Sequence, residues 1–150
     1  MFLDFEFLRL TSRPNQFLVA PKGLTQAAPH EESPVFAVAF ERLCNAFAAM
    51  IEGQPRVEVR ARSEDGRRWE LVQRSRLFRF ADDVSVRFID NGNGNGTATL
   101  AIYSRSRLGY GDLGVNRRRV QRWLALLQAE LAPRQGNAAD LSGSRAWPSP

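Results

Sequence analysis

The chain has few of the side chains on which most catalytic and metal centres depend. Its 150 residues include one histidine, His30, and one cysteine, Cys44. His30 stands beside Glu31 and Glu32 in a stretch without periodic pattern, where we expect it to face solvent. No histidine cluster and no pair of cysteines exists to hold a metal, and a serine triad or cysteine–histidine pair is not expected. The sequence therefore predicts no catalytic residue, no metal and no cofactor.

Long apolar runs are also missing. Residues 1–10 are apolar but are interrupted by Asp4, Glu6 and Arg9 and lack a basic start and a small-residue cleavage site, so they do not resemble a secretion signal. No run approaches the length that spans a bilayer. Together with the single cysteine, which fits a reducing compartment, these features predict a cytoplasmic protein.

Lysine is nearly absent too, since arginine supplies 20 of the 21 basic residues. A net charge of +5 and a pI near 10.6 are typical of proteins that bind nucleic acid or an anionic membrane. Most of the arginines, however, alternate with apolar residues, which is typical of a solvated sheet face. The alternative is a nucleic-acid surface with a basic helical face and aromatic side chains that stack on bases. Its arginines would be Arg117, Arg118 and Arg122, and its aromatic residues would be Trp69, Tyr103 and Tyr110. The core accounts equally well for these aromatic residues, so nucleic acid is not expected.

Hydrophobic periodicity predicts the elements. Ser33 and Pro34 resemble an N-cap and a first helical residue, and Phe36, Phe40, Leu43, Phe47 and Ile51 form one helical stripe that ends near Gly53. Alternating residues predict four strands, and a second apolar stripe predicts a last helix with Asn116 as its N-cap. The predicted strands and last helix span residues 57–62, 69 to about 80, 84–89, 97–106 and 117–131.

Short turns between consecutive strands favour antiparallel pairing. We therefore predict an α+β fold of two layers, in which a four-stranded antiparallel meander carries both helices on one face, in the order α-β-β-β-β-α. Residues 1–33 are expected to form an irregular arm that packs on the domain, with room for one short strand at 16–20. Residues 34–131 form the single domain, and residues 132–150 have the composition of a flexible tail.

Gly109 to Gly114 fit the dinucleotide pattern G-x-G-x-x-G. That pattern binds a dinucleotide only in a parallel sheet, where a further strand carries an acidic residue about 20 residues on. Here the predicted helix is the last element, so the dinucleotide interpretation fails. What remains is a glycine-rich corner at a helix N-terminus, which favours an anion and is followed by three arginines, 117–119.

These arginines need acidic partners, and two explanations stay open. In the first, Asp82, Asp83 and Asp112 form an internal salt-bridge network with them. In the second, arginine side chains converge on a small carboxylate or phosphate anion. The candidate ligand residues are Arg76, Arg79, Arg105, Arg107, Tyr110, Asn116 and Arg119. Asp82 and Asp83 also form a candidate acid–base pair, but neighbouring strand residues point to opposite faces.

Two long segments resemble a known family. "SRLFRFADDVSVRF", residues 75–88, and "IYSRSRLGYGDLGVNRRRV", residues 102–120, are similar to the signatures of domain-of-unknown-function family 1499, found in bacteria and plastids. "SRPNQFLVAP", residues 12–21, resembles the family's upstream segment, although many relatives have cysteines where this chain has Arg13 and Gln16. The resemblance implies a shared fold and a shared arginine–aspartate constellation, and it implies no activity.

The sequence thus predicts a non-enzymatic binding or accessory domain whose partner is a small anion. One alternative is a structural charge network, with a protein partner on the open face of the sheet. The other is an enzyme that acts on an anionic substrate. An apolar patch on the open face would favour the protein partner, and a concave pocket holding Arg76, Arg105 and Tyr110 would favour the ligand. The oligomeric state does not follow from the sequence.

Overall fold

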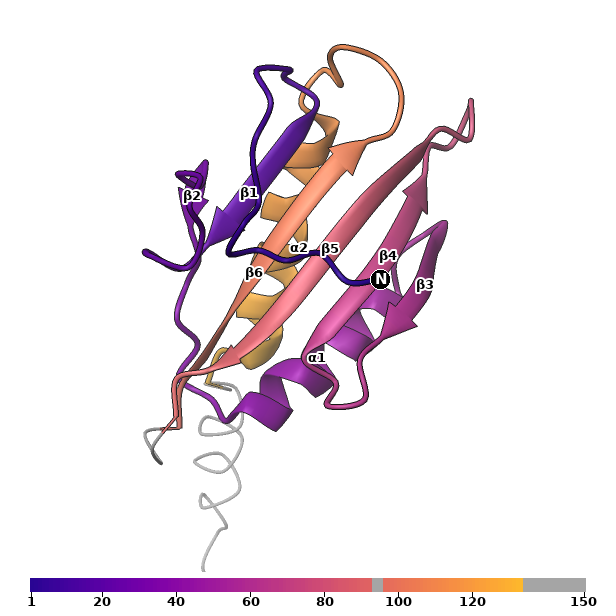
Figure 1. Cartoon of the computed structure of the whole chain (residues 1–150). Coiled ribbons are helices and arrows are strands. Elements are labelled where there is room, and N and C mark those ends of the chain that lie inside the picture. The colour runs from indigo at the N-terminus through magenta and orange to yellow at the C-terminus, as the bar shows by residue number, and fades with distance from the viewer. Residues whose placement is uncertain (93–95, 134–150) are drawn as a thin grey trace, which may run out of the picture.

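The computed structural model describes residues 1–92 and 96–133, which form an α+β fold with one sheet and two helices (Figure 1). Residues 93–95 and residues 134–150 of the expected tail lie outside the described residues. None of the described helices is both long and apolar enough to cross a membrane. The elements are β1 (Gln16–Ala20), β2 (Glu31–Glu32), α1 (Phe40–Glu52), β3 (Val57–Arg62), β4 (Arg68–Arg74), β5 (Ala81–Asp90), β6 (Ala98–Ser106) and α2 (Val115–Leu131).

The sheet has six strands in the order β2-β1-β6-β5-β4-β3, so the prediction of four strands was too few. The predicted meander β3 to β6 is present and antiparallel. Two further strands come from residues 1–33: β1, at the position 16–20 where one short strand was expected, pairs antiparallel with β6, and β2 adds a short parallel pair outside β1. Gln16 lies opposite Arg105, a pairing that no local pattern can reveal. All five residues of β1 are buried, so the strand lacks the alternation that marks a half-exposed strand.

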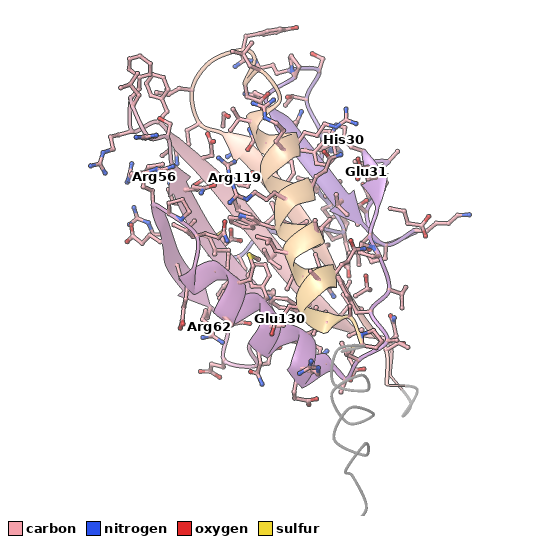
Figure 2. All side chains as sticks on the ribbon, turned by 180° about the vertical axis from the view of Figure 1, so that it is seen from behind. His30, Glu31, Arg56, Arg62, Arg119 and Glu130 are labelled. Atoms are coloured by element: carbon pink, nitrogen blue, oxygen red, sulfur yellow. The ribbon has the colours of Figure 1, made fainter. Side chains whose placement is uncertain are left out.

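Both helices cover the same face of the sheet, as predicted, and Figure 2 shows them from that side. The main core lies between the layers and centres on Phe47, whose ring makes edge contacts with Trp69, Phe88 and Trp123 at centroid distances of 5.1–6.2 Å. Cys44 packs beside this core as a small apolar residue, and burial raises the pKa of its thiol to about 11.

The first helix begins at Phe40, so the prediction of a helix from Ser33 and Pro34 was wrong. The segment before the helix extends along the sheet, where Phe36 exchanges two backbone hydrogen bonds with Ala98 at 2.8 and 3.0 Å. The Ser33 hydroxyl lies 3.0 Å from that of Thr99 and caps no helix. These residues therefore pair with the sheet and do not cap a helix, although their sequence resembles a helix N-terminus.

The strand expected from Trp69 to about Phe80 ends at Arg74 instead. Residues 75–80 turn back, with the Ser75 N–H donating to the Phe80 carbonyl at 2.9 Å and Arg79 at φ +57°. As a result β5 starts at Ala81 and takes in Asp82 and Asp83, which lie between the predicted strand limits of about 80 and 84.

The other face of the sheet was expected to be open, but the N-terminal segment crosses it (Figure 1). Phe5 and Leu8 pack in a second apolar cluster with Leu18, Ala20, Ala101 and Tyr103. The Leu3 N–H donates to Glu70 Oε1 at 2.7 Å, which fixes the start of the segment on β4. The apolar part of this face near β1 and β6 is therefore covered by the chain itself.

This second cluster provides a matched test. Phe5 is 1% exposed, whereas Phe7, two residues along, is 64% exposed. We expect Phe5→Ala to lower the free energy of unfolding in urea by about 3–5 kcal/mol, because it leaves a cavity in the cluster. Phe7→Ala should change it by about 0.5 kcal/mol or less. Equal effects of the two variants would contradict the packing of the N-terminal segment on the sheet.

Candidate functional site

The glycine-rich segment forms the corner between β6 and α2. Gly109 and Gly114 adopt φ of +87° and +80°, which glycine tolerates best. Gly114 is the N-cap, and Asn116 is not, contrary to the sequence prediction. Asp112 satisfies the first helical N–H groups instead: its carboxylate accepts from the N–H of Gly114 at 2.7 Å and from that of Asn116 at 3.2 Å. Asp112 therefore satisfies backbone N–H groups at this helix end, and it forms no ion pair with an arginine of the described residues.

Asn116 is fully buried and joins three segments of the chain. Its Oδ1 accepts from the Ser104 hydroxyl on β6 at 2.6 Å. Its Nδ2 lies within hydrogen-bonding distance of the Asn15 carbonyl, the Ser106 hydroxyl and Asp112 Oδ2, at 3.0, 2.8 and 2.6 Å. An asparagine that looked like a helix cap is thus the link between α2, β6 and the start of β1.

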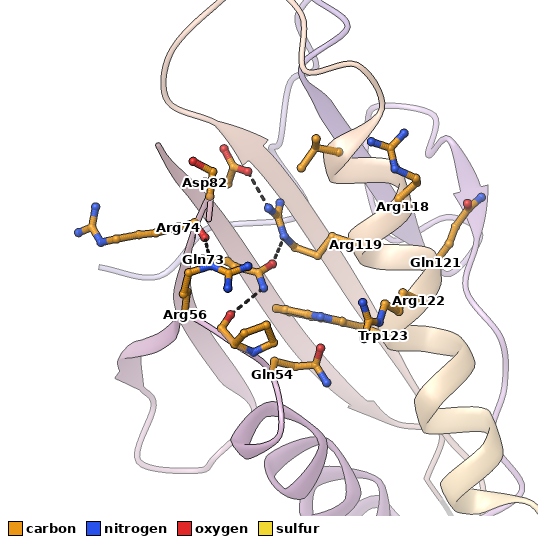
Figure 3. Close-up of a pocket in the computed structure, with 13 residues that line it drawn as sticks. Gln54, Arg56, Gln73, Arg74, Asp82, Arg118, Arg119, Gln121, Arg122 and Trp123 are labelled. Atoms are coloured by element: carbon orange, nitrogen blue, oxygen red, sulfur yellow. Dashed lines mark hydrogen bonds and ion pairs between the residues drawn. The ribbon is translucent and has the colours of Figure 1, made fainter. Parts of the chain in front are cut away.

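Arg119 completes this buried network one turn further along α2 (Figure 3). Its Nη2 donates to Asp82 Oδ2 on β5 at 2.7 Å, and the two side chains are only 7% and 10% exposed. Its Nη1 donates to Ser104 Oγ at 2.9 Å and to Asn116 Oδ1 at 2.8 Å, and its Nε donates to Gln73 on β4. Among the described residues no buried side-chain nitrogen or oxygen lacks a partner, so the network is satisfied internally.

Asp82 and Asp83 point to opposite faces of the sheet, as expected for neighbouring strand residues. Asp82 faces α2, whereas Asp83 faces the other side and binds Arg107 through contacts of 2.7–3.1 Å. This pair is exposed, and the Asp83 carboxylate raises the pKa of the Arg107 guanidinium. Since each aspartate has its own arginine, the two carboxylates do not form an acid–base pair.

The structure does not bring the predicted anion ligands together. Arg105 and Arg107 lie on the sheet face opposite α2, whereas Arg119 lies beneath α2. Arg76, Arg79 and Tyr110 lie exposed in the loops at the end of the sheet. Strand alternation explains the separation, because Ser104 and Ser106 face α2 and the arginines beside them point away. Five cavities that the described residues form are lined by neither Arg76 nor Tyr110, and Arg105 lines one of them on the sheet face opposite α2.

A different cavity, of about 580 Å³, opens beside the buried pair. It lies between α2, the end of β4 and the connection from α1 to β3, with Trp123 one turn below Arg119 (Figure 3). Five arginines line it: Arg56, Arg74, Arg118, Arg119 and Arg122. Asp82 is the only acidic residue among the lining residues. No pattern in the sequence marked Arg56 and Arg74 as site residues. Arg118 and Arg122, one helical turn apart, were considered with Arg117 only as part of a basic face for nucleic acid, an alternative that the sequence did not favour.

His30 lies on the far side of α2 from Arg119 and Arg56 (Figure 2). Its Nδ1 accepts from the Leu18 N–H at 2.9 Å, and its ring stacks on Phe17 at 5.1 Å. Partial burial of the ring lowers the pKa of His30, and nearby Arg117 lowers it further. Nothing in residues 1–92 and 96–133 gathers three histidine, cysteine, aspartate or glutamate side chains as a metal site would need.

Comparison with known proteins places the chain in a family without an assigned role. The profile of the family described as "Protein of unknown function (DUF1499)" matches residues 9–127. No curated protein matches the chain. A solved structure of a START superfamily protein from Mycobacterium smegmatis is similar, at 12% sequence identity and a TM-score of 0.37. That similarity covers 67% of this chain and 94% of the other.

The two arginine–aspartate pairs make a matched comparison for stability. We expect Arg119→Met to lower the free energy of unfolding by about 3–5 kcal/mol, because it leaves Asp82 buried without its cation. Arg107→Met removes an exposed pair, which is typically worth about 0–1 kcal/mol. Urea unfolding of both variants tests this difference, and similar losses would show that the pair beneath α2 is not buried in solution.

The single histidine permits an unambiguous titration. We expect the ¹H NMR signals of the His30 ring to titrate with a midpoint below the ordinary value of 6.5, because burial disfavours the charged ring. Because the pKa of His30 is lower in the folded chain than in the unfolded chain, the unfolded chain binds the ring proton more readily. Neutral His30 therefore favours the folded state, and this contribution to stability is fully present above the ordinary pKa. It is lost as pH falls through the pKa of the folded state. A midpoint at or above the ordinary value would contradict the packing on Phe17.

Proposed function

The chain belongs to the DUF1499 family, and since that family has no known function, we propose one from the chain's own geometry: it is a binding module for a small anion. The ligand carries carboxylate or phosphate groups and occupies the cavity beside Arg119 and Asp82. One observation carries this proposal: the cavity is lined by more guanidinium groups than there are carboxylates to neutralise them.

The charges on the cavity wall support an anion. Asp82, the one acidic lining residue, is engaged by Arg119. Arg56, Arg74, Arg118 and Arg122 form no ion pair with any carboxylate of the described residues. Guanidinium groups that share a concave site repel one another and attract small anions. An anion in the cavity would supply the negative charge that this part of the chain lacks.

The size and chemistry of the cavity also fit a small molecule. A volume of about 580 Å³ lies within the ordinary range for ligand pockets. Arginine presents a planar fork of donors that matches a carboxylate or a phosphate group. Arg118 and Arg122 stand one turn apart on α2, and Arg56 comes from the opposite wall, ahead of β3. Ligand groups can therefore be held from two sides.

The buried pair of Arg119 and Asp82 supports this role without binding the ligand. Because Arg119 neutralises Asp82, the floor of the cavity does not repel an anion. The contacts of Arg119 with Gln73, Ser104 and Asn116 fix α2 against the sheet, and so fix the wall that carries Arg118 and Arg122. The internal network and the anion site therefore lie side by side but use different residues: Arg119 and Asp82 belong to the network, and Arg56, Arg118 and Arg122 bind the anion.

Thermal unfolding with inorganic phosphate tests the proposal. A ligand at about 100 times its dissociation constant stabilises a protein by about 2.7 kcal/mol, so phosphate should raise the Tm above that in chloride at equal ionic strength. Replacing Arg118 and Arg122 by glutamine should weaken the apparent affinity at least about tenfold, since charged hydrogen bonds are worth about 1.5–3 kcal/mol. Glutamine keeps a similar helix propensity, so the helix is retained.

The control replaces Arg9 and Arg42 by glutamine, which removes the same charge from exposed positions outside the cavity. It should keep the response to phosphate. If phosphate, sulfate and citrate all fail to raise the Tm of the wild-type chain, or if both double variants respond equally, the arginines serve the structure alone and the proposal is wrong.

A further inference from the structure

The end of the sheet beside α2 exposes an unusual number of large apolar side chains. Six of the twelve exposed large hydrophobic residues in the described part of the chain lie in two short loops. We call them the loop patch: Leu77, Phe78, Phe80, Leu108, Tyr110 and Leu113. Their exposures run from 52% for Phe80 to 94% for Leu113. A concentration of this kind marks an interaction surface rather than chance exposure.

The two loops meet at one end of the sheet. Residues 75–80 lead from β4 into β5, and residues 107–114 lead from β6 into α2, so both project beyond the strands at the same end (Figure 1). The Arg107 N–H donates to the Ala81 carbonyl at 3.3 Å, which joins the bases of the loops. Phe80 and Leu108 line one shallow depression between them. Phe80 and Leu108 therefore bring the apolar side chains of the two loops to one depression.

Defined contacts hold the loops in shape. The Phe80 N–H donates to the Ser75 hydroxyl at 2.9 Å, and Asn15 Nδ2 donates to the Gly109 carbonyl at 3.1 Å. Leu113 has φ +55°, which is uncommon for a leucine, and its side chain is almost fully exposed. Neither packing nor backbone preference explains a leucine at this position, and such strain gathers at functional sites.

Arginines alternate with the apolar side chains of the patch. Arg76 and Arg79 are exposed on either side of Leu77 and Phe78, and Arg107 precedes Leu108. The acidic residues nearby are engaged, since Asp83 binds Arg107 and Asp112 caps α2. Because Arg107 and Asp83 neutralise each other, the positive charge between the projecting apolar tips comes from Arg76 and Arg79.

From this combination we infer that the loop patch docks the protein on an anionic lipid surface. The leucine and phenylalanine side chains enter the boundary between headgroups and acyl chains, and Tyr110 sits at headgroup level. The arginines reach the lipid phosphates with their apolar stems along the patch. A membrane fits better than a protein groove because the apolar groups are the tips of projecting loops with cations between them.

Vesicle sedimentation with the full chain tests this inference. The wild-type chain should bind vesicles of phosphatidylcholine and phosphatidylserine and bind those of phosphatidylcholine alone far more weakly. High salt should weaken the binding, because it screens the arginines. Leu77→Ser combined with Leu113→Asn should weaken binding to the mixed vesicles at least about tenfold, which corresponds to about 1.4 kcal/mol. Asparagine tolerates positive φ, so this variant keeps the loop conformation.

The matched control, Val35→Ser with Leu126→Ser, removes exposed apolar groups away from the loops and should bind like the wild-type chain. Replacing Arg76 and Arg79 by glutamine should remove the preference for phosphatidylserine. Wild-type binding that the loop variant does not weaken would overturn the inference. Absence of vesicle binding by the wild-type chain would overturn it as well. In that case, a dimer detected by ultracentrifugation would indicate that the loop patch is buried between two copies of the chain.

Discussion

The ion pair between Arg119 and Asp82 is the interaction on which the corner of this structure depends. Both groups are nearly excluded from water, which is costly unless each remaining donor and acceptor finds a partner. Ser104, Asn116 and Gln73 supply those partners, and they come from β6, α2 and β4. This requirement fixes where α2 lies on the sheet, so it also sets the shape of the arginine-lined cavity and the position of the loop patch.

The two segments that resemble the family signatures supply most of the buried network, to which Gln73 is added from outside them. Asp82 lies in the first segment, and the second contributes Ser104, Asp112, Asn116 and Arg119. The glycines of the apparent dinucleotide pattern shape the corner that leads into α2, in a sheet where β6 is antiparallel to both neighbours. Of the arginines that line the cavity, Arg118 and Arg119 lie in the second segment, whereas Arg56, Arg74 and Arg122 lie outside both.

Periodicity predicted what depends on local pattern: the apolar stripes of both helices, the strands β3 to β6, and the opposite orientation of Asp82 and Asp83. It did not predict contacts between distant segments. Strand β1 is buried on both sides, so its sequence has no alternation, and its pairing with β6 joins residues far apart in the chain. Ser33 and Asn116 have the chemistry of helix caps, but Thr99 and Ser104, brought near by the fold, engage them instead. The cavity combines arginines from three separate segments for the same reason.

The central claim is that Arg119 belongs to a complete internal network while the arginines around it remain available to an anion. Side-chain ¹⁵N NMR of the arginine Nε–H groups during a titration with inorganic phosphate tests it most directly. The account predicts a slowly exchanging Arg119 signal that stays in place while the signals of Arg118 and Arg122 shift. An Arg119 signal that shifts most, or that exchanges as fast as those of exposed arginines, would contradict it.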